Sequence, residues 1–337
     1  MNRSTVIKLV AIAAAVAILV VLPYVISSYY VSLISIVFIS AILASSINML
    51  AGDANLVSLG HAGIAASAGY GLAWASKQGY DLGGQLAVAG IMTVVTSAIY
   101  GLISMRTKGI FFLMVTLAAG MVCYGIAFRW SSVTGGDNGL TGISRPPGLA
   151  SYWQFYFFVL AIFVIVTIAL VITSRSPFGL AMRGIRDSET RMRSLGYNVP
   201  NYKFVAVFLS GIVAGIAGVL TVWQFEFISP SAGGFDRSAM VMVMVIIGGI
   251  GTLFGPLLGA TLVVSIEQVL STYFDRWPMV LGALFIAVVI FAPHGLDGGI
   301  RQLTRWFRRR RSPKDPAITG TSHDARSTAT QSTTTQQ

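Results

Sequence analysis

Residues 176–203, SPFGLAMRGIRDSETRMRSLGYNVPNYK, are the one long charged stretch that is enclosed between apolar segments of this chain. Residues 153–172 before it and residues 204–222 after it are almost entirely apolar. A helix needs about 20 such residues to cross the hydrocarbon core of a bilayer. A polar segment between two spans is held at a fixed depth on one face of the membrane. The pattern therefore predicts a membrane protein with a surface on which a soluble partner docks.

The composition of the chain favours the same class of protein. Apolar and aromatic residues (Ala, Val, Ile, Leu, Met, Phe, Trp, Tyr, Cys) make up 55% of the 337 residues, and charged residues make up only 10%. A soluble domain carries about 25% charged residues, so much of this apolar surface must face lipid. A membrane β-barrel would show short segments of alternating hydrophobicity, which the sequence lacks. We therefore predict an all-α polytopic membrane protein.

The apolar runs predict about ten transmembrane helices with two glycine-rich breaks between them. The first break, residues 52–63, follows the second span, and the second break, residues 248–259, follows the eighth. The expected spans are residues 6–26, 30–50, 58–76, 85–104, 109–128, 152–173, 204–224, 238–250, 255–272 and 278–292.

The distribution of Lys and Arg predicts the orientation of these spans. If the 176–203 loop is cytoplasmic, the alternation of spans places both termini and the segments around Asp53, Arg106 and Gly251 in the cytoplasm as well. Five of the 23 Lys and Arg residues then lie outside and the other 18 inside, as the positive-inside rule requires. The net charge of +11 therefore reflects topology, and we expect no nucleic-acid partner.

The two ends of the chain carry further signals. Arg3 and Lys8 before an apolar run resemble a signal peptide, but the small residues come too early for cleavage, so we expect an uncleaved first span. Residues 300–337 are expected to form a separate cytoplasmic tail. Its basic start, with Trp306 and Phe307, suits contact with anionic lipid. Its Ser-, Thr- and Gln-rich remainder is expected to be disordered.

The two glycine-rich breaks are candidates for a transport path. Interrupted segments at matching places in two halves of a membrane protein point to such a path, and the shared orientation of the halves implies a parallel repeat. The alternative is close helix packing, which we favour for Gly251, Gly255 and Gly259 because they recur at every fourth residue. His61 could line the path, or it could donate a hydrogen bond to a neighbouring carbonyl and have no further role.

The sequence contains no motif of a known catalytic site. Cys123 is the only cysteine, which excludes disulfides within the chain and thiolate metal sites. None of the five lysines follows a glycine-rich phosphate loop, so the chain does not bind ATP in that way. Metalloprotease and serine-hydrolase motifs are absent too. We predict that the chain is not an enzyme and has no catalytic residue, no metal site and no bound cofactor.

Start and stop signals within the 176–203 loop predict two short helices. Residues 180–185 suit the first helix. The second is expected at residues 189–195, because Asp187 or Ser188 can accept hydrogen bonds from its free amide groups. The loop is thus expected to be structured although it is highly charged.

Two further residues define the second short helix. Glu189 lies in its first turn, where a negative charge suits the positive end of the helix. Gly196 follows the helix where a left-handed C-cap is expected. A solvated charged loop is the alternative, but two capped helices between two spans favour a docking surface.

Four segments together resemble one family of membrane proteins. They are the run from Ser176 to Leu220, SLGHAGIAASAGYG at 58–71, the pair GIFFLMVTLA at 109–118 and TGGDNGLTGI at 134–143, and MVIIGGIGTLFGPLLGA at 244–260. This combination, in this order, resembles the permeases of branched-chain amino acid ABC importers, specifically the LivM-type subunit. The resemblance covers most of residues 45–295.

The resemblance implies a set of partners and a division of the chain. Residues 1–299 would be the transmembrane permease domain, in the cell inner (plasma) membrane. Its partners would be a homologous second permease, two cytoplasmic ATPase subunits that hydrolyse the ATP, and an extracytoplasmic solute-binding protein. The 176–203 loop would contain the coupling helix. The expected coupling residues are Arg183, Arg186, Asp187, Glu189, Leu195 and Gly196.

One segment of the loop departs from the family pattern. Small residues usually follow the Glu, whereas this chain has Thr190, Arg191, Met192 and Arg193. The departure leaves the fold intact and changes the surface that meets the ATPase. The expected residues of the transport path are Asn55, Ser58, Gly60, His61, Thr116, Gly135, Gly136, Gly248 and Gly249.

Several functions remain open on the sequence alone. The leading one is import of branched-chain or related hydrophobic amino acids, and relatives of the same fold import urea, short amides or sugars. An ion-coupled secondary carrier would need ionisable groups within the membrane, for which only His61 and Glu267 are candidates. A channel would need a selectivity filter, and none is visible.

Overall fold

The computed structural model describes residues 21–273 and 276–291. All of them belong to the first of two compact units, Met1–Ile300. The second unit, Arg301–Gln337, lies outside the described residues. Most of the expected first span and the whole expected tail therefore also lie outside them.

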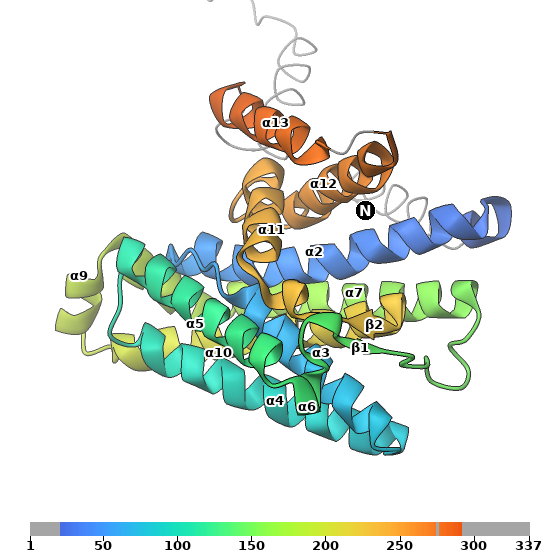
Figure 1. Cartoon of the computed structure of the whole chain (residues 1–337). Helices are drawn as coiled ribbons and strands as arrows, with labels where there is room; N and C mark the ends of the chain where they lie inside the picture. The colour runs from blue at the N-terminus through green and yellow to red at the C-terminus, as the bar shows by residue number, and fades with distance from the viewer. Residues whose placement is uncertain (1–20, 274–275, 292–337) are drawn as a thin grey trace, which may run out of the picture. The chain divides into compact units, whose positions relative to one another are not determined.

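The described residues form helices joined by short loops, with one small two-stranded ribbon (Figure 1). Residues 21–25 are helical. The longer helices are α2 (Ser28–Ala54), α3 (His61–Lys77), α4 (Leu82–Ser104), α5 (Gly109–Arg129), α7 (Tyr152–Arg175), α10 (Val199–Phe225), α11 (Phe235–Gly248), α12 (Gly255–Tyr273) and α13 (Trp277–Phe291). The short elements are α6 (Ser131–Thr134), η1 (Gly136–Asn138), β1 (Leu140–Thr141), α8 (Pro177–Asp187), α9 (Glu189–Ser194), β2 (Phe227–Ile228) and η2 (Pro230–Gly233).

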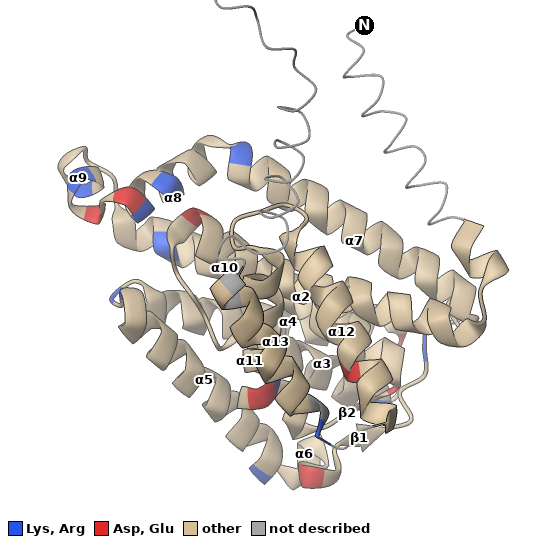
Figure 2. Ribbon diagram, turned by 90° about the horizontal axis from the view of Figure 1, so that it is seen from above, with Lys and Arg blue, Asp and Glu red and all other residues tan. Residues whose placement is uncertain are grey.

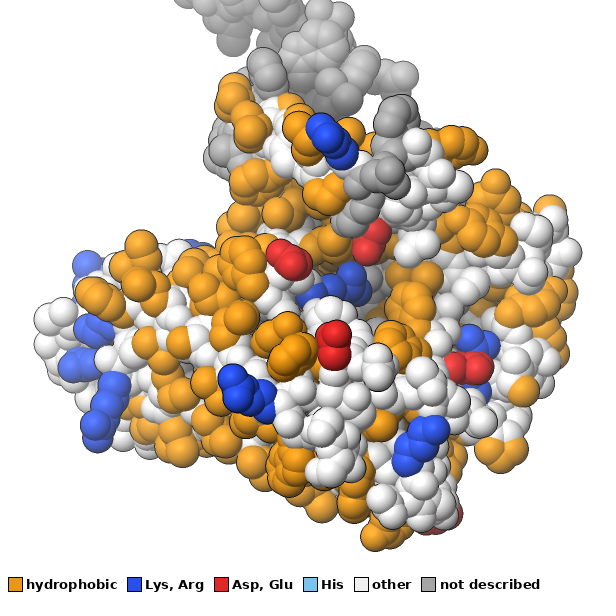
Figure 3. Space-filling view, in the orientation of Figure 1, with side chains coloured by type: hydrophobic (Ala, Val, Ile, Leu, Met, Phe, Trp, Pro, Cys, Tyr) orange, Lys and Arg blue, Asp and Glu red, His pale blue; other side chains and the backbone are white. Residues whose placement is uncertain are grey.

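Helices α2 and α10 form the centre of the packed core. Helix α10 packs against α2, α3 and α4, and α2 also packs against α7 and α12. Most residues of the apolar windows of α2 and α10 are buried, whereas fewer than a third of those of α4, α5 and α7 are. Figure 3 shows hydrophobic side chains over much of the face that α5 presents. Such a surface is stable against lipid or another apolar protein surface.

Glycines allow the central helices to approach one another closely. A Cβ at Gly218 of α10 would overlap the backbone of Ala65 in α3. A Cβ at Gly211 would overlap Ser97 of α4, and one at Gly215 would overlap Thr93. Close contact between helices through small residues is typical of membrane proteins.

The helices match the expected spans in position but not all in length. Among the described residues, a helix lies at each expected span after the first, and six of these helices are long and apolar enough to cross a membrane: α2, α4, α5, α7, α10 and α12. Helices α3, α11 and α13 are shorter. The chain is thus an all-α polytopic membrane protein, while the number of about ten spans and the location of the termini stay predictions.

Charged residues gather mainly at two opposite ends of the helices (Figure 2). One end holds α8 and α9, and the other holds α6, β1 and β2. At the first end, side chains of the 176–203 loop contact Gly52, Asp53 and Lys108. At the second end, Leu140 of β1 pairs with Ile228 of β2. The alternation of spans predicts the same grouping of segments.

Candidate functional site

The 176–203 loop forms two capped helices, as predicted. Helix α8 begins after Ser176, whose side chain accepts a hydrogen bond from the amide of Gly179 (3.4 Å). Helix α9 begins after Ser188, whose side chain accepts from the amide of Arg191 (3.3 Å). Ser188, rather than Asp187, is therefore the cap. Gly196 has a φ of +85°, which confirms the expected left-handed position.

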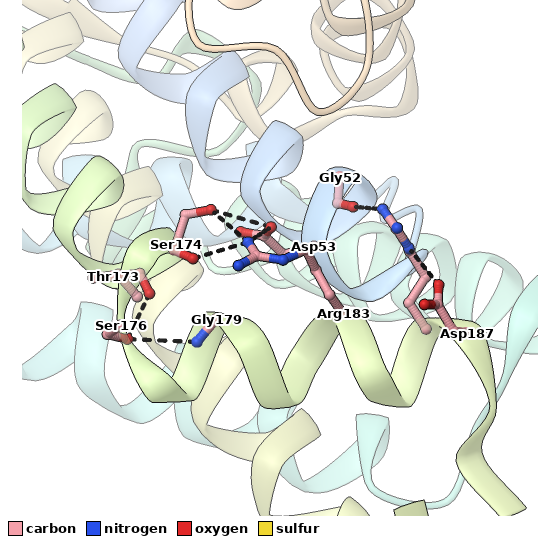
Figure 4. A network of polar contacts seen from close by, with 9 residues as sticks. Gly52, Asp53, Thr173, Ser174, Ser176, Gly179, Arg183 and Asp187 are labelled. Atoms are coloured by element: carbon pink, nitrogen blue, oxygen red, sulfur yellow. Dashed lines mark hydrogen bonds and ion pairs between the residues drawn. The ribbon is translucent and has the colours of Figure 1, made fainter. Parts of the chain in front are cut away.

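Two arginines of α8 bond back to other parts of the chain, and Figure 4 shows Arg183 beside Asp53 and Ser174. Arg183 Nη1 donates to Asp53 Oδ1 (3.1 Å) and to the carbonyl of Ser174 (2.9 Å). Arg186 Nη1 donates to the carbonyl of Gly52 (2.7 Å). Both guanidinium groups thus connect α8 to the end of α2. Arg183 and Arg186 were expected as coupling residues, and the structure shows that they join the loop to α2.

Glu189 holds α9 against two longer helices. Its carboxylate forms ion pairs with Lys108 (2.6 Å), which precedes α5, and with Lys203 of α10. The Lys203 side chain is only 3% exposed, so this carboxylate partner offsets the cost of burying its ammonium group. Burial alone would raise the pKa of the Glu189 carboxyl, but the two lysines outweigh it and lower the pKa below its usual range.

The opposite side of the loop faces outward. Leu180 and Leu195 are each 66% exposed. Arg191 and Arg193 of α9 are exposed as well. Met192 instead is buried against Gly184 of α8. The loop therefore presents apolar side chains beside arginines, while the Glu189 carboxylate of α9 is directed inward.

The first glycine-rich segment contains a buried hydrogen-bonded chain. His61 is fully buried, with Nδ1 2.8 Å from Ser58 Oγ and Nε2 2.7 Å from Ser210 Oγ. Ser210 donates its own proton to the carbonyl of Ser46 (2.6 Å). Ser210 must therefore accept from His61, which places the imidazole proton on Nε2 and makes Nδ1 an acceptor. Both ring nitrogens thus have serine hydroxyl partners, rather than the single carbonyl partner that the sequence suggested, and a place of His61 on the path stays a prediction.

Other expected path residues near His61 lie in close contacts or in a special backbone position, and their place on a path stays a prediction. Asn55 ends α2 with a φ of +53°. A Cβ at Gly60 would overlap the Tyr100 ring and the carbonyl of Thr116. Thr116 Oγ1 in turn accepts from the amide of Leu59 (3.3 Å). These contacts fix the segment between α2 and α3 against α4 and α5.

The second glycine-rich segment contains a tight crossing of α11 and α12. A Cβ at Gly248 would overlap the backbone of Gly255, and one at Gly259 would overlap the carbonyl of Met244. Gly249 has a φ of +111°. These contacts confirm the packing role that was predicted for Gly255 and Gly259.

The two glycine-rich segments are joined through one asparagine of α2. Asn48 Nδ2 donates to the carbonyl of Thr252 (2.9 Å), and Asn48 Oδ1 accepts from the amide of Gly251 (2.7 Å). Sequence reasoning did not single out Asn48. A carboxamide within an otherwise apolar span was the signal that could have found it, because such a group needs polar partners.

Gly135 and Gly136 lie at the other end of the helices. Both have positive φ, and a Cβ at Gly135 would overlap the carbonyl of Gly139. The nearby Thr134 Oγ1 donates to the carbonyl of Ala127 (2.5 Å). The structure therefore does not bring the expected path residues into one cluster. It separates these glycines from the His61 and Gly248 groups.

A cavity lined by both polar and apolar residues lies beside the end of α2. Its volume is about 180 Å³. The lining comes from α2, from the end of α7 and from the segment that joins α11 to α12. Polar lining residues are Ser45, Asn48, Asp53, Thr167, Ser174, Arg175 and Thr252.

Known proteins of one family are similar to this chain. The family model described as branched-chain amino acid transport system / permease component matches residues 29–290. The high-affinity branched-chain amino acid transport system permease protein LivM of Escherichia coli K12 is 27% identical over 324 residues, covering 88% of this chain and 76% of that protein.

Shorter similarities extend to other transport systems. The high-affinity branched-chain amino acid transport system permease protein BraD of Pseudomonas aeruginosa is 29% identical over 165 residues (48% of this chain, 52% of that protein). The autoinducer 2 import system permease protein LsrC of Klebsiella pneumoniae is 30% identical over 134 residues, 38% of each chain. No solved structure matches. The apolar helices and these relatives make the chain a multi-pass inner-membrane protein, and it belongs to the family of branched-chain amino acid transport permeases.

Proposed function

We propose that this chain is the permease subunit of an ATP-driven importer that carries branched-chain or related hydrophobic amino acids into the cytoplasm. Two ATPase subunits supply the energy, a homologous second permease completes the path, and an extracytoplasmic solute-binding protein delivers the solute. The similarity to LivM over 88% of the chain supports the solute class.

One structural observation carries the proposed coupling to an ATPase. The inner side of α9 is held by the ion pairs of Glu189, while its outer side exposes Arg191 and Arg193 next to Leu195. A rigidly held, outward-facing element can transmit a push, whereas a mobile loop would absorb it. The two arginines favour an ATPase groove that carries carboxylates beside an apolar surface.

The test compares two glycines with the same backbone. Gly196 has a φ of +85° and Gly79 a φ of +78°, and a Cβ at either position meets open space. Gly79 lies between α3 and α4, at the end opposite to the 176–203 loop. Gly196→Trp is expected to abolish ATP-dependent leucine uptake in proteoliposomes that contain the assembled importer, because the indole blocks docking. Gly79→Trp is expected to retain uptake. Normal uptake by the Gly196 variant would overturn the docking role of α9.

A different solute within the same transport class is the second candidate. The similarity to LsrC supports it, because that protein is a permease of an autoinducer 2 import system. Competition of unlabelled branched-chain amino acids, urea, short amides and sugars against the uptake distinguishes these solutes. Inhibition by amino acids alone supports the first candidate.

The contacts of His61 and Glu267 do not favour a carrier driven by an ion gradient. Both nitrogens of His61 bond to serines, and Glu267 lies 3.9 Å from Arg237 in an ion pair. Neither group is arranged to bind and release a proton along a path. Uptake by this chain alone, driven by a proton gradient in vesicles, would favour the carrier and contradict the importer.

A further inference from the structure

The end of α2 receives the contacts of α8. Arg183 bonds to Asp53, and Arg186 bonds to the carbonyl of Gly52. Figure 4 shows Arg183 reaching from α8 to this end of α2. Asp53 also accepts from Ser174 Oγ (3.1 Å), at the end of α7. A displacement of α8 therefore acts directly on the last turn of α2.

The same end of α2 holds the second glycine-rich segment. Asn48 bonds with its side-chain amide to both Gly251 and Thr252, which lie more than 200 residues further along the chain. Gly52, one turn after Asn48, packs directly against Gly251, where a Cβ on Gly52 would come 2.5 Å from the Gly251 Cα. One helical end thus contacts the loop on one side and this segment on the other.

Only a short stretch of α2 separates the two sets of contacts, and the segment 249–254 has room to move. Asn48 and Asp53 are separated by about 7.5 Å along the axis of an α-helix, so the two sets of contacts move together unless the helix unwinds. The cavity of about 180 Å³ lies next to both sets and is lined by Asn48, Asp53 and Thr252. Gly249 and Gly251 have positive φ, so the segment is not part of a continuous helix that would resist displacement.

From this juxtaposition we infer that the end of α2 relays movement of the 176–203 loop to the segment 249–254, with Asp53 as the receiving residue and Asn48 as the transmitting residue. The inference rests on the proposed function, because the ATPase subunits drive the loop. It adds that the second glycine-rich segment responds to ATP although no hydrogen bond or ion pair among the described residues joins it to the loop. Asp53 and Asn48 act as positioning residues and need not contact the solute.

The experiment uses the assembled importer with one reporter cysteine. Leu253, which is 43% exposed, is replaced in the variant Leu253→Cys, and the native thiol is removed by Cys123→Ala. The rate of labelling with a water-soluble maleimide is measured with and without a non-hydrolysable ATP analogue, and ATP hydrolysis is measured in parallel. We expect the analogue to change the labelling rate several-fold.

Asn48→Ala tests the transmitting residue. This variant is expected to retain assembly and ATP hydrolysis, but the labelling rate at position 253 should no longer respond to the analogue. Ser45→Ala is the matched control, because Ser45 lines the same cavity and makes no hydrogen bond to residues 249–254 among the described contacts. It should respond like the parent. A full response in Asn48→Ala would overturn the relay.

An exchange of charges between Asp53 and Arg183 tests the receiving residue with a pair of substitutions rather than with a single one. Asp53→Arg alone should abolish the labelling response, and Asp53→Arg combined with Arg183→Asp should restore it, because the ion pair is formed again with its charges exchanged. Failure of the double variant to respond, with the protein assembled, would argue against Asp53.

Different results would contradict the proposed function and the relay. If the parent protein neither assembles with ATPase subunits nor supports ATP-dependent uptake, the proposed function is wrong and the relay with it. If uptake is normal but the labelling rate at position 253 never responds to the analogue, the relay alone is wrong.

Discussion

Glu189 and His61 show how single polar residues are accommodated in a mostly apolar protein. Glu189 neutralises the nearly buried ammonium group of Lys203. His61 uses both ring nitrogens, bonding to Ser58 and Ser210. His61 has no contact with solvent and the Glu189 side chain is only 19% exposed, so removal of a partner leaves a polar group poorly compensated.

Replacement of Glu189 by Gln is expected to destabilise the protein by about 3 kcal/mol, because it leaves a buried charge without its partner. The matched control is Arg193→Gln. Arg193 is a distant partner of the same carboxylate (3.9 Å) and its side chain is 54% exposed, so its loss should cost at most about 1 kcal/mol. Thermal unfolding in detergent measures both effects. Equal effects would show that the ion pair with Lys203 does not stabilise α9.

The same carboxylate makes stability depend on pH. Because the folded pKa of Glu189 lies below its ordinary value, its contribution is fully present above the ordinary Glu pKa of about 4.3 and is lost as the pH falls through the folded pKa. The unfolding temperature of the parent should therefore fall more steeply below this pH than that of Glu189→Gln. Parallel pH profiles of the two proteins would contradict the lowered pKa.

Ser210→Ala is expected to destabilise the protein by about 1–3 kcal/mol, because the Nε2 proton of buried His61 loses its acceptor. The Michaelis constant for the solute should stay unchanged if His61 has only a structural role. Uptake kinetics and thermal unfolding are measured together. A large change in the Michaelis constant at unchanged stability would instead place His61 on the transport path.

At the scale of single elements, local sequence signals predict the 176–203 loop well. Its serine caps accept hydrogen bonds from nearby amides and Gly196 adopts the left-handed position, and the two helices appear within a few residues of the expected bounds. The outward or inward direction of each side chain was not predictable in this way. Arg183 and Arg186 are charged residues of a polar loop, yet both contact α2.

The contact between α10 and α3 depends on one glycine. Gly218→Ala is expected to destabilise the protein by about 1–3 kcal/mol, because the added methyl group overlaps the Ala65 backbone and forces the helices apart. Gly125→Ala in α5 is the control, since a Cβ there meets open space. It should be neutral or stabilising, given the higher helix propensity of Ala. Thermal unfolding separates the two outcomes, and equal effects would mean that the crossing is not tightly packed.

At the scale of the whole described unit, the two ends of the helices are held by different contacts. The end with α8 and α9 relies on ion pairs of Glu189 and Arg183. The other end relies on the β1–β2 ribbon and on Arg145. Different sets of residues therefore hold the two ends.

Arg145 fastens the second end through several contacts at once. It donates to the carbonyls of Trp223 (2.7 Å) and Gln224 (3.1 Å), pairs with Glu226 (3.6 Å), and lies 4.6 Å from the centre of the Phe155 ring. Arg145→Ala is expected to increase amide hydrogen exchange in residues 140–149 without affecting the 176–203 loop. Arg145→Lys should have an intermediate effect, because Lys keeps the charge but loses the planar fork. Increased exchange at both ends would contradict their independence.

The sequence by itself determined the membrane class, the positions of the helices after the first expected span, and the capped geometry of the 176–203 loop. These features depend on hydrophobicity and on interactions between residues that are close along the chain. Only the tertiary structure decided that Glu189 pairs with Lys108 and Lys203, and that Asn48 joins α2 to the second glycine-rich segment. Such contacts join residues up to 204 positions apart, and their partners are selected by how the helices pack rather than by any local pattern.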